Sequence, residues 1–193
     1  MIDPPSVDVT AHVVEHLATE PGYEEPVRRG VDYLLREQEP NGSWFGRWGV
    51  NYLYGTGAAL PALAAAGVPA AHPAMRCAVA WLEGIQNGDG GFGEDCRSYE
   101  MGEAGHPWHG RGVSTPSQTA WALLGLVAAD EEHSNSAARA ARWLVENQRS
   151  DGDWDEEYFT GTGFPRDFLI RYHLYRIVWP VLALGRLSRA HAG

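Results

Sequence analysis

The sequence predicts an all-α fold, a partial α/α toroid of about seven helices in which inner helices surround an axis and outer helices cover them. Two observations support this prediction. A Gln-x-x-x-Gly-x-aromatic pattern occurs three times, and apolar residues at helical spacing precede each copy. About seven helices make an incomplete (α/α)6 barrel, and we expect residues 1–193 to form a single domain.

Each copy of the pattern is predicted to close a helix and to act as a structural staple. The glutamine amide can pair with carbonyl groups left free at the helix end, and the aromatic ring folds back onto that end. The Gly, Asn and Asp residues between them tolerate a positive φ, which ends a helix at little cost. The staple residues are Gln38, Trp44, Gln86, Phe92, Gln148 and Trp154.

The first helix is predicted to follow Ser6 and to run to about Leu17. Asp8 lies in its first turn and His12 one turn later on the same face, so the two side chains can point together. From residue type alone, Asp8 stabilises the helix dipole and His12 is a half-buried histidine. A second helix follows and ends at Gln38.

Residues 45–57 place four aromatic residues among glycines and are predicted to form a loop. Ordering such a loop costs conformational entropy, which favours a functional role over a simple connection. By its pattern, this loop is the leading candidate for a site. Further helices are predicted at 58–66, at 73–86, at 119–129 and from a cap at 134–136 to 148, with an irregular region at 88–111.

The chain is predicted to end in a helix that runs to about Arg189. Ahead of it, Phe164, Phe168, Tyr172 and Tyr175 recur at intervals of four, four and three residues, and they would form one aromatic stripe if this segment is helical. Such a stripe usually packs in a core. Several buried tyrosine hydroxyls would then need partners, so a cavity wall is the alternative.

The composition excludes several classes of partner. The 15 Lys and Arg residues are scattered through a chain of net charge −10, so nucleic acid is not expected as a partner. No apolar run is long enough to span a bilayer, and the first residues lack a basic segment followed by an apolar one. We therefore expect a cytoplasmic protein.

The two cysteines, Cys77 and Cys96, are isolated and are expected to be free thiols. A zinc site made from Asp95, Cys96, His106 and His109 is an alternative. Histidines and cysteines in a loop without a fixed scaffold are, however, usually surface residues. We expect neither a metal nor a cofactor.

Five segments of the chain resemble the C-terminal part of bacterial squalene-hopene cyclases, which are class II triterpene cyclases. They are residues 3–12, 42–57, 93–99, 114–121 and 158–165, and the resemblance extends over nearly the whole chain. The three staples are similar to the QW motifs of that family. The resemblance implies an α/α toroid whose dry cavity folds squalene or a related polyprene. In that cavity a carboxylic acid protonates an alkene, and aromatic faces hold the successive carbocations.

The resemblance also implies roles for individual residues. His12 would hydrogen-bond to the catalytic acid and raise its acidity, with Asp8 in the same polar cluster. Tyr54 would help to return the proton at the top of the cavity. The substrate-binding wall would consist of Trp48, Phe164, Phe168, Ile170, Tyr172 and Tyr175.

One feature of that family is missing. The family's acid lies in an Asp-x-Asp-Asp motif, which these 193 residues do not contain, and residues 100–111 also depart from the expected pattern. We therefore expect a terpene cyclase component that contributes the aromatic cavity wall and is not active alone. The exposed inner face would be covered by an N-terminal cyclase half that carries Asp-x-Asp-Asp, or by self-association. Through such a partner the protein would lie peripherally at the membrane.

Other functions remain alternatives. A non-catalytic isoprenoid-binding or scaffold protein would keep the staples and the aromatic face without turnover. An independent small cyclase would need Asp8 or Asp95 as its acid. Protein prenyltransferase β subunits also have Gly-rich α/α toroids, but they need an Asp-x-Cys pair on zinc, whereas Asp95 and Cys96 are adjacent.

Overall fold

The computed structural model describes residues 4–100 and 108–192. Within these ranges it contains seven α-helices, one short 3-10 helix and one two-stranded sheet. The all-α prediction is confirmed, and the sheet is an addition that the sequence did not predict. His106 and most of the segment 100–111 lie outside the described residues.

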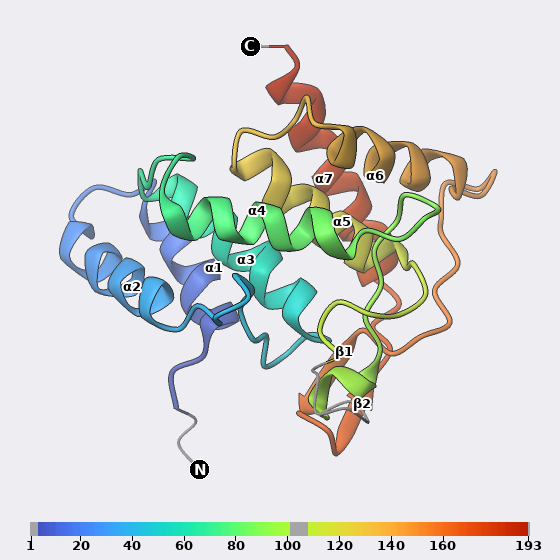
Figure 1. The fold of residues 1–193 in the computed structure, drawn as a ribbon, viewed down its shortest axis with the longest axis horizontal. Helices are drawn as coiled ribbons and strands as arrows, with labels where there is room; N and C mark the ends of the chain where they lie inside the picture. Colours follow the sequence, from blue (N-terminus) through green and yellow to red (C-terminus); the bar gives the residue numbers. More distant parts are fainter. Residues whose placement is uncertain (1–3, 101–107, 193) are drawn as a thin grey trace.

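The helices form two layers. The inner helices are α1 (Val7–Leu17), α3 (Tyr52–Ala65), α5 (Pro116–Ala128) and α7 (Tyr175–Ala190), and the outer helices are α2 (Glu24–Arg36), α4 (Pro73–Ile85) and α6 (Asn135–Glu146). Along the inner layer, α1 packs on α3, α3 on α5, and α5 on α7. Figure 1 shows α4 lying across α3 and α5. No helix in the described ranges has both the length and the apolar character needed to cross a bilayer.

The outer helices end in the three staples. Gln38 Nε2 donates to the carbonyl oxygens of Gly42 (2.8 Å) and Ala74 (2.9 Å), and Gln86 Nε2 donates to those of Gly90 (2.8 Å) and Ser136 (2.9 Å). Each glutamine therefore ties its own loop to the first turn of the next outer helix.

The staple aromatics are buried under the helix that they follow. The indole Nε1 of Trp44 donates to the Leu34 carbonyl at 2.7 Å, and that of Trp154 donates to the Leu144 carbonyl at 2.8 Å. Phe92 occupies the same position in the second staple and is fully buried. The rings thus pack against the C-terminal ends of the outer helices and, in two copies, donate a hydrogen bond to a carbonyl group there.

The predicted loop at 45–57 is wrong in its second half, because α3 begins at Tyr52. A Cβ added to Gly55 would lie 2.3 Å from the Trp44 carbonyl oxygen, and one added to Gly57 would lie 2.8 Å from Trp121 Cβ. These glycines let α3 approach its neighbours closely, which is why a glycine-rich segment is helical here. Tyr54 therefore lies on the first turn of a buried helix.

The predicted helical stripe at 164–175 is also wrong. Phe164 ends strand β1 (Gly161–Phe164) and Phe168 begins strand β2 (Phe168–Ile170), and the two strands pair antiparallel. Pro165 and Arg166, the latter at φ 74°, turn the chain between them. Of the four stripe residues, Tyr175 alone belongs to a helix.

Buried carboxylates close the N-termini of the two central inner helices. Glu94 Oε2 accepts hydrogen bonds from the backbone N–H groups of Asn51 (3.2 Å) and Leu53 (2.8 Å) at the start of α3. Glu156 Oε2 accepts from the backbone N–H of Ser117 (3.0 Å) and from its hydroxyl at the start of α5. A negative charge or oxygen acceptor at this end of a helix is favoured by the helix dipole.

Both glutamates follow their staple aromatic by two residues, a repeat signal that the sequence reading missed. After the first staple this place is taken by Gly46. At the first staple the carboxylate lies on the inner helix and the donor lies in the loop. Asp8 on α1 accepts a hydrogen bond from the backbone N–H of Trp48 at 2.7 Å. Each staple loop is thus joined to an inner helix through one carboxylate.

Burial raises the pKa of Glu94, although hydrogen bonds from the backbone at Leu53, Gly110, Asn51 and Tyr52 act in the opposite direction. Its second oxygen, Oε1, is buried and has no hydrogen-bond partner among the described residues. An ionised oxygen without a donor is costly to bury, whereas a protonated carboxyl group carries no charge. The geometry and the pKa shift therefore both favour a neutral carboxylic acid.

The staples give a first testable prediction. Gln86→Ala removes four side-chain hydrogen bonds, two donated by Nε2 and two accepted by Oε1 from Ser136 Oγ and Arg139 Nη1, and is expected to lower the free energy of unfolding by about 2 kcal/mol. Gln148→Ala removes one exposed hydrogen bond, to the Gly152 carbonyl, and is expected to cost less than about 0.5 kcal/mol. Urea denaturation of the isolated chain measures both values, and equal losses would contradict this account of the staples.

Glu94 gives a second prediction. Because its pKa is higher in the folded chain than the ordinary value of 4.5, its stabilising contribution is full below about pH 4.5 and is lost as the pH rises through the folded pKa. Glu94→Gln removes this dependence, so relative to wild type the variant should gain stability progressively above pH 4.5.

Urea denaturation between pH 4 and pH 8 would test this second prediction. Glu146→Gln, an exposed glutamate on α6, is the matched control and should differ from wild type by a constant amount. A Glu94→Gln difference that does not change with pH would reject the neutral carboxylic acid.

Candidate functional site

The contact between His12 and Tyr54 joins two inner helices at the candidate site. His12 Nε2 on α1 and Tyr54 Oη on α3 lie 3.2 Å apart, and the tautomer of the imidazole decides which atom donates. Burial lowers the pKa of His12, while the nearby carboxylates of Glu15 and Asp8 act in the opposite direction. Burial also raises the pKa of Tyr54. A neutral imidazole therefore faces a neutral phenol at pH 7.

Further aromatic rings extend this contact across all four inner helices. The ring centroids of Tyr54 and Trp121 are 4.8 Å apart, and Trp121 lies 5.9 Å from Tyr175 and 6.0 Å from Trp179. Trp179 also stacks on His12 at 6.2 Å, which links α7 back to α1. Burial raises the pKa of Tyr175 to about 12, so its hydroxyl also stays protonated. We call these five residues the aromatic cluster.

Asp8 lies beside the aromatic cluster without joining it. Its carboxylate is fully buried and accepts from the backbone N–H groups of Val9 (3.0 Å) and Trp48 (2.7 Å). No hydrogen bond joins it to His12 in the part of the chain that the structure describes, and its charge acts on the imidazole through space. Asp8 therefore holds the Trp48 loop against α1.

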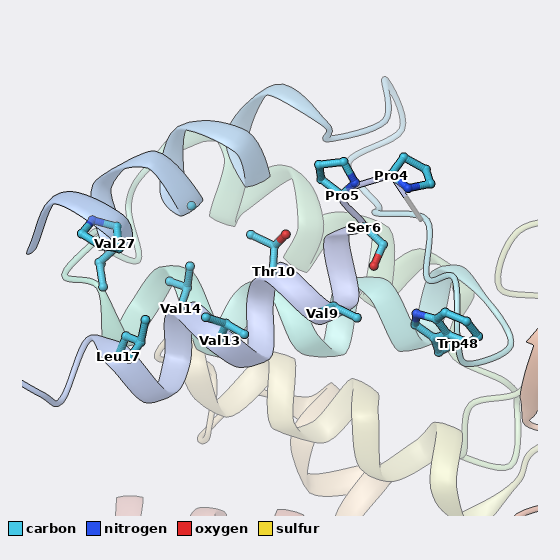
Figure 2. A pocket seen from close by; sticks show the side chains of 12 residues that line it. Pro4, Pro5, Ser6, Val9, Thr10, Val13, Val14, Leu17, Val27 and Trp48 are labelled. Atoms are coloured by element: carbon cyan, nitrogen blue, oxygen red, sulfur yellow. The ribbon is translucent and has the colours of Figure 1, made fainter. Parts of the chain in front are cut away.

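Trp48 is half-buried, and the Arg47 guanidinium lies 5.3 Å from its ring centroid. It lines a groove of about 550 Å³ between α1 and α2, and no other predicted site residue lines that groove (Figure 2). Most of the remaining lining is apolar and comes from Pro4, Pro5, Val9, Val13, Val14, Leu17, Pro26 and Val27. Val9 and Val13 are about half exposed, so this edge of the inner layer is open.

The hairpin places its aromatic residues at the surface. Phe164, Phe168 and Tyr172 are 51%, 56% and 40% exposed, so the interpretation of these three as core packing is wrong. Ile170 on β2 is half-buried. The ring centroids of Tyr172 and Tyr175 lie 4.8 Å apart, which connects Tyr172 to the aromatic cluster.

Sequence reasoning missed two members of the aromatic cluster, Trp121 and Trp179. Trp179 follows Tyr175 by four residues on α7, a spacing that places both on one helix face. Trp121 lies in a helix that is apolar on all sides, so the spacing of apolar residues did not indicate which face of the helix the ring lies on. Both indole N–H groups are buried and have no hydrogen-bond partner among residues 4–100 and 108–192.

Asp95 and His109, two residues of the zinc alternative, make other contacts. Asp95 forms an ion pair with Arg97, which lowers its pKa although partial burial opposes the shift. His109 stacks on Tyr52 with ring centroids 3.4 Å apart, and burial lowers its pKa to about 4. Residues 4–100 and 108–192 contain no group of three metal-ligating side chains. Because Asp95 is held ionised by Arg97, it is a poor proton donor.

Solved structures share this fold. An ent-copalyl diphosphate synthase from Streptomyces platensis superposes with a TM-score of 0.64 at 24% identity, over 98% of this chain and 34% of that chain. The type II terpene cyclase MstE from Scytonema, in complex with geranylgeranyl dihydroxybenzoate, gives a TM-score of 0.63 at 22% identity, over 98% and 55%. These likenesses show the α/α toroid fold alone, of which this chain forms part.

Relatives of known name are more similar in sequence. A squalene-hopene cyclase from Alicyclobacillus acidocaldarius is 56% identical over 191 residues, which are 97% of this chain and 30% of that protein. The squalene-hopene cyclase of Zymomonas mobilis is 50% identical over 96% of this chain and 28% of its own length. The dammaradiene synthase of Dryopteris crassirhizoma is 39% identical over 96% and 30%. The chain therefore spans about 30% of the length of these relatives.

A family model covers almost the whole sequence. Residues 1–189 match the model described as squalene-hopene cyclase C-terminal domain. The chain therefore belongs to the squalene-hopene cyclase C-terminal domain family.

Proposed function

We propose that this chain is the C-terminal component of a squalene-hopene-type cyclase, and that it supplies the aromatic wall on which squalene or a related polyprene cyclises. The observation that carries the proposal is the His12–Tyr54 contact inside the aromatic cluster, which Tyr175 extends to the partly exposed ring of Tyr172. Aromatic faces stabilise carbocations without forming bonds to them, which is what a polycyclisation needs.

The roles of His12 and Tyr54 follow from their neutral state. A neutral imidazole can donate one hydrogen bond while it accepts another, so His12 can orient a carboxylic acid while it keeps Tyr54 in place. The phenol of Tyr54 keeps its proton at pH 7 and can donate a hydrogen bond to His12 Nε2, which leaves the other ring nitrogen of His12 free to donate to the acid. Both residues are therefore proposed to serve the proton-donating end of the cavity.

The acid itself is proposed to come from elsewhere. The chain holds no Asp-x-Asp-Asp motif, Asp8 accepts two backbone hydrogen bonds, and Asp95 is paired with Arg97. The groove between α1 and α2 is an open apolar edge that another part of a cyclase would cover. The proposed partner is the N-terminal cyclase portion that carries the motif, in a cytoplasmic complex that reaches the membrane only through that partner.

The second candidate function is non-catalytic binding of isoprenoids. The observation that favours it is the missing acid, because an aromatic wall without a proton donor still provides an apolar surface for a polyprene. This alternative predicts that squalene binds without turnover and that loss of His12 changes nothing.

The first test is reconstitution. We expect no product when the purified chain is incubated with squalene alone. Cyclised product should form when the chain is co-expressed with the remaining, Asp-x-Asp-Asp-bearing part of the Alicyclobacillus relative, with products identified by gas chromatography and mass spectrometry. Product from the chain alone would reject the external acid, and binding without product in the mixture would favour the non-catalytic alternative.

In the reconstituted complex, His12→Ala is expected to reduce the rate of cyclisation at least about 100-fold, because the acid loses its orienting partner. His16→Ala is the matched control, since this histidine lies four residues later on the same helix and is exposed. If the two variants cyclise squalene at the same rate, His12 has no part in proton donation.

Phe168→Ala separates a cavity wall from a structural role. Because this ring is 56% exposed, its removal should leave the melting temperature of the isolated chain within about 2 °C of wild type. In the complex it should change the product distribution, because one face that stabilises the cation is gone. Tyr23→Ala on α2, 45% exposed, is the control and should change neither property.

A further inference from the structure

Among the described residues, side-chain contacts join α1 to α7 at two levels. The Trp179 ring stacks on the His12 imidazole, with centroids 6.2 Å apart and planes inclined by 24°. About one turn further along α1 and about two turns further along α7, Glu15 and Arg186 form an ion pair of 2.6 Å. The side chains of this pair are only 24% and 32% exposed. The ion pair therefore helps to hold the indole of α7 against the face of His12.

The imidazole of His12 is constrained from two directions. Tyr54 Oη contacts the ring edge at Nε2, 3.2 Å away, and Trp179 contacts the ring face. The edge contact alone leaves the ring free to tilt about the hydrogen bond, and the face contact alone leaves it free to turn in its own plane. Together they fix the ring, and with it the direction of the second nitrogen, Nδ1. This nitrogen is the one that the proposed function assigns to the acid.

Trp179 contributes the face of its ring and not its N–H group. The indole Nε1 is buried and finds no hydrogen-bond partner in the part of the chain that the structure describes. A buried tryptophan usually pairs this group, because leaving it unpaired is costly. Trp121 and Tyr175 contact the indole in T-shaped geometry, each with a centroid distance of 6.0 Å. The indole is thus oriented by other rings, which indicates that this position requires an aromatic face.

Burial, and not a neighbouring charge, keeps His12 neutral. Burial has the largest effect on its pKa and lowers it. Glu15 and Asp8, both on α1, raise the pKa, and Arg186 on α7 lowers it. Tyr54 on α3 is itself neutral, since burial raises its pKa. The apolar ring that covers the imidazole therefore matters more to its protonation state than these charges do.

We propose that Trp179 is a positioning residue for proton donation: its indole face fixes the plane of the His12 imidazole, so that Nδ1 presents its proton in one direction to the acid of the N-terminal cyclase portion. Trp179 acts through His12 and transfers no proton itself. The inference rests on the proposed function for the acid, whereas the fixed imidazole is a property of this chain alone.

NMR spectroscopy of the isolated chain tests the fixed imidazole. With isotope-labelled histidine, the shifts of the two ring nitrogens report the tautomer of His12, a titration reports its pKa, and His12→Ala identifies its signals. We expect one tautomer, protonated at Nδ1, in wild type and in Trp179→Phe, which keeps an aromatic face. Trp179→Leu should give a mixture of tautomers. It should also raise the pKa of His12 toward the ordinary value of 6.5, because water then reaches the ring.

Trp143→Leu is the matched control. This tryptophan is also half-buried, but it lies on the outer helix α6 and donates to Asp89 Oδ2 at 3.1 Å. Its replacement removes the same atoms and should lower the stability of the chain at least as much as Trp179→Leu does, yet it should leave the tautomer and the pKa of His12 unchanged. A loss of stability is thereby separated from a loss of positioning.

A double-variant cycle in the reconstituted complex tests whether Trp179 acts through His12. Trp179→Leu should lower kcat for squalene at least about 10-fold with KM changed less than about twofold, and Trp179→Phe should restore at least about a third of the wild-type kcat. In a His12→Ala background, Trp179→Leu should have no further effect, because the residue through which it acts is gone.

An unchanged tautomer and pKa of His12 in Trp179→Leu would overturn the proposal. A normal cyclisation rate in that variant would also overturn it, and so would effects of the two substitutions that multiply, because Trp179 would then act on the substrate directly. The NMR result does not depend on turnover. If the wild-type complex forms no product, the proposed function fails, while a change of His12 confined to Trp179→Leu would still establish Trp179 as the residue that orients it.

Discussion

The fold depends on the side-chain amides of the first two staple glutamines, Gln38 and Gln86, each of which is shared between a loop and the next outer helix. An outer helix ends with carbonyl groups that have no helical partner, and the chain must then turn back to begin an inner helix. Trp44 and Trp154 donate to one such carbonyl group at the ends of α2 and α6. Gln38 and Gln86 bridge their loops to the start of a neighbouring outer helix. Successive outer helices are thereby fixed to one another, and the inner helices follow.

The inner layer combines close helix packing with buried polar groups. Gly55 and Gly57 bring α3 against its neighbours, while Glu94 and Glu156 satisfy backbone N–H groups that this packing removes from water. The same layer carries the aromatic cluster. Its titratable members are all shifted toward their neutral forms by burial, which suits an apolar reaction surface where a stray charge would compete with a carbocation.

The helix bounds predicted from the sequence were most accurate where the repeated staple pattern supported the helical spacing of apolar residues. The staples and α4 fall close to their predicted bounds, because glutamine, glycine and aromatic residues occur there at fixed offsets. The first turns of α3 were missed because the glycines of that segment read as loop residues, although here they permit close packing. The hairpin was missed because Phe164 and Phe168 happen to keep a helical interval across a turn. Of the candidate site, His12 and Tyr54 meet as neighbours. Trp121 carried no local signal, and the four-residue spacing of Trp179 from Tyr175 was the signal that was missed.

The unequal burial of the inner helices also determines where the molecule opens. A linear array of repeats is held by contacts between neighbours, so its interior units have two neighbours and its end units one. α3 and α5 are interior units, with nearly every residue buried, whereas α1 and α7 each present an exposed apolar side. We therefore expect amide protons of the central helices to exchange with solvent mainly on global unfolding, and those of the terminal helices to exchange through local fraying. The aromatic cluster includes residues of both kinds of helix: His12 and Tyr175 lie on the terminal helices, and Tyr54 and Trp121 lie on the central ones. The cluster therefore joins the more stable helices to those expected to open locally.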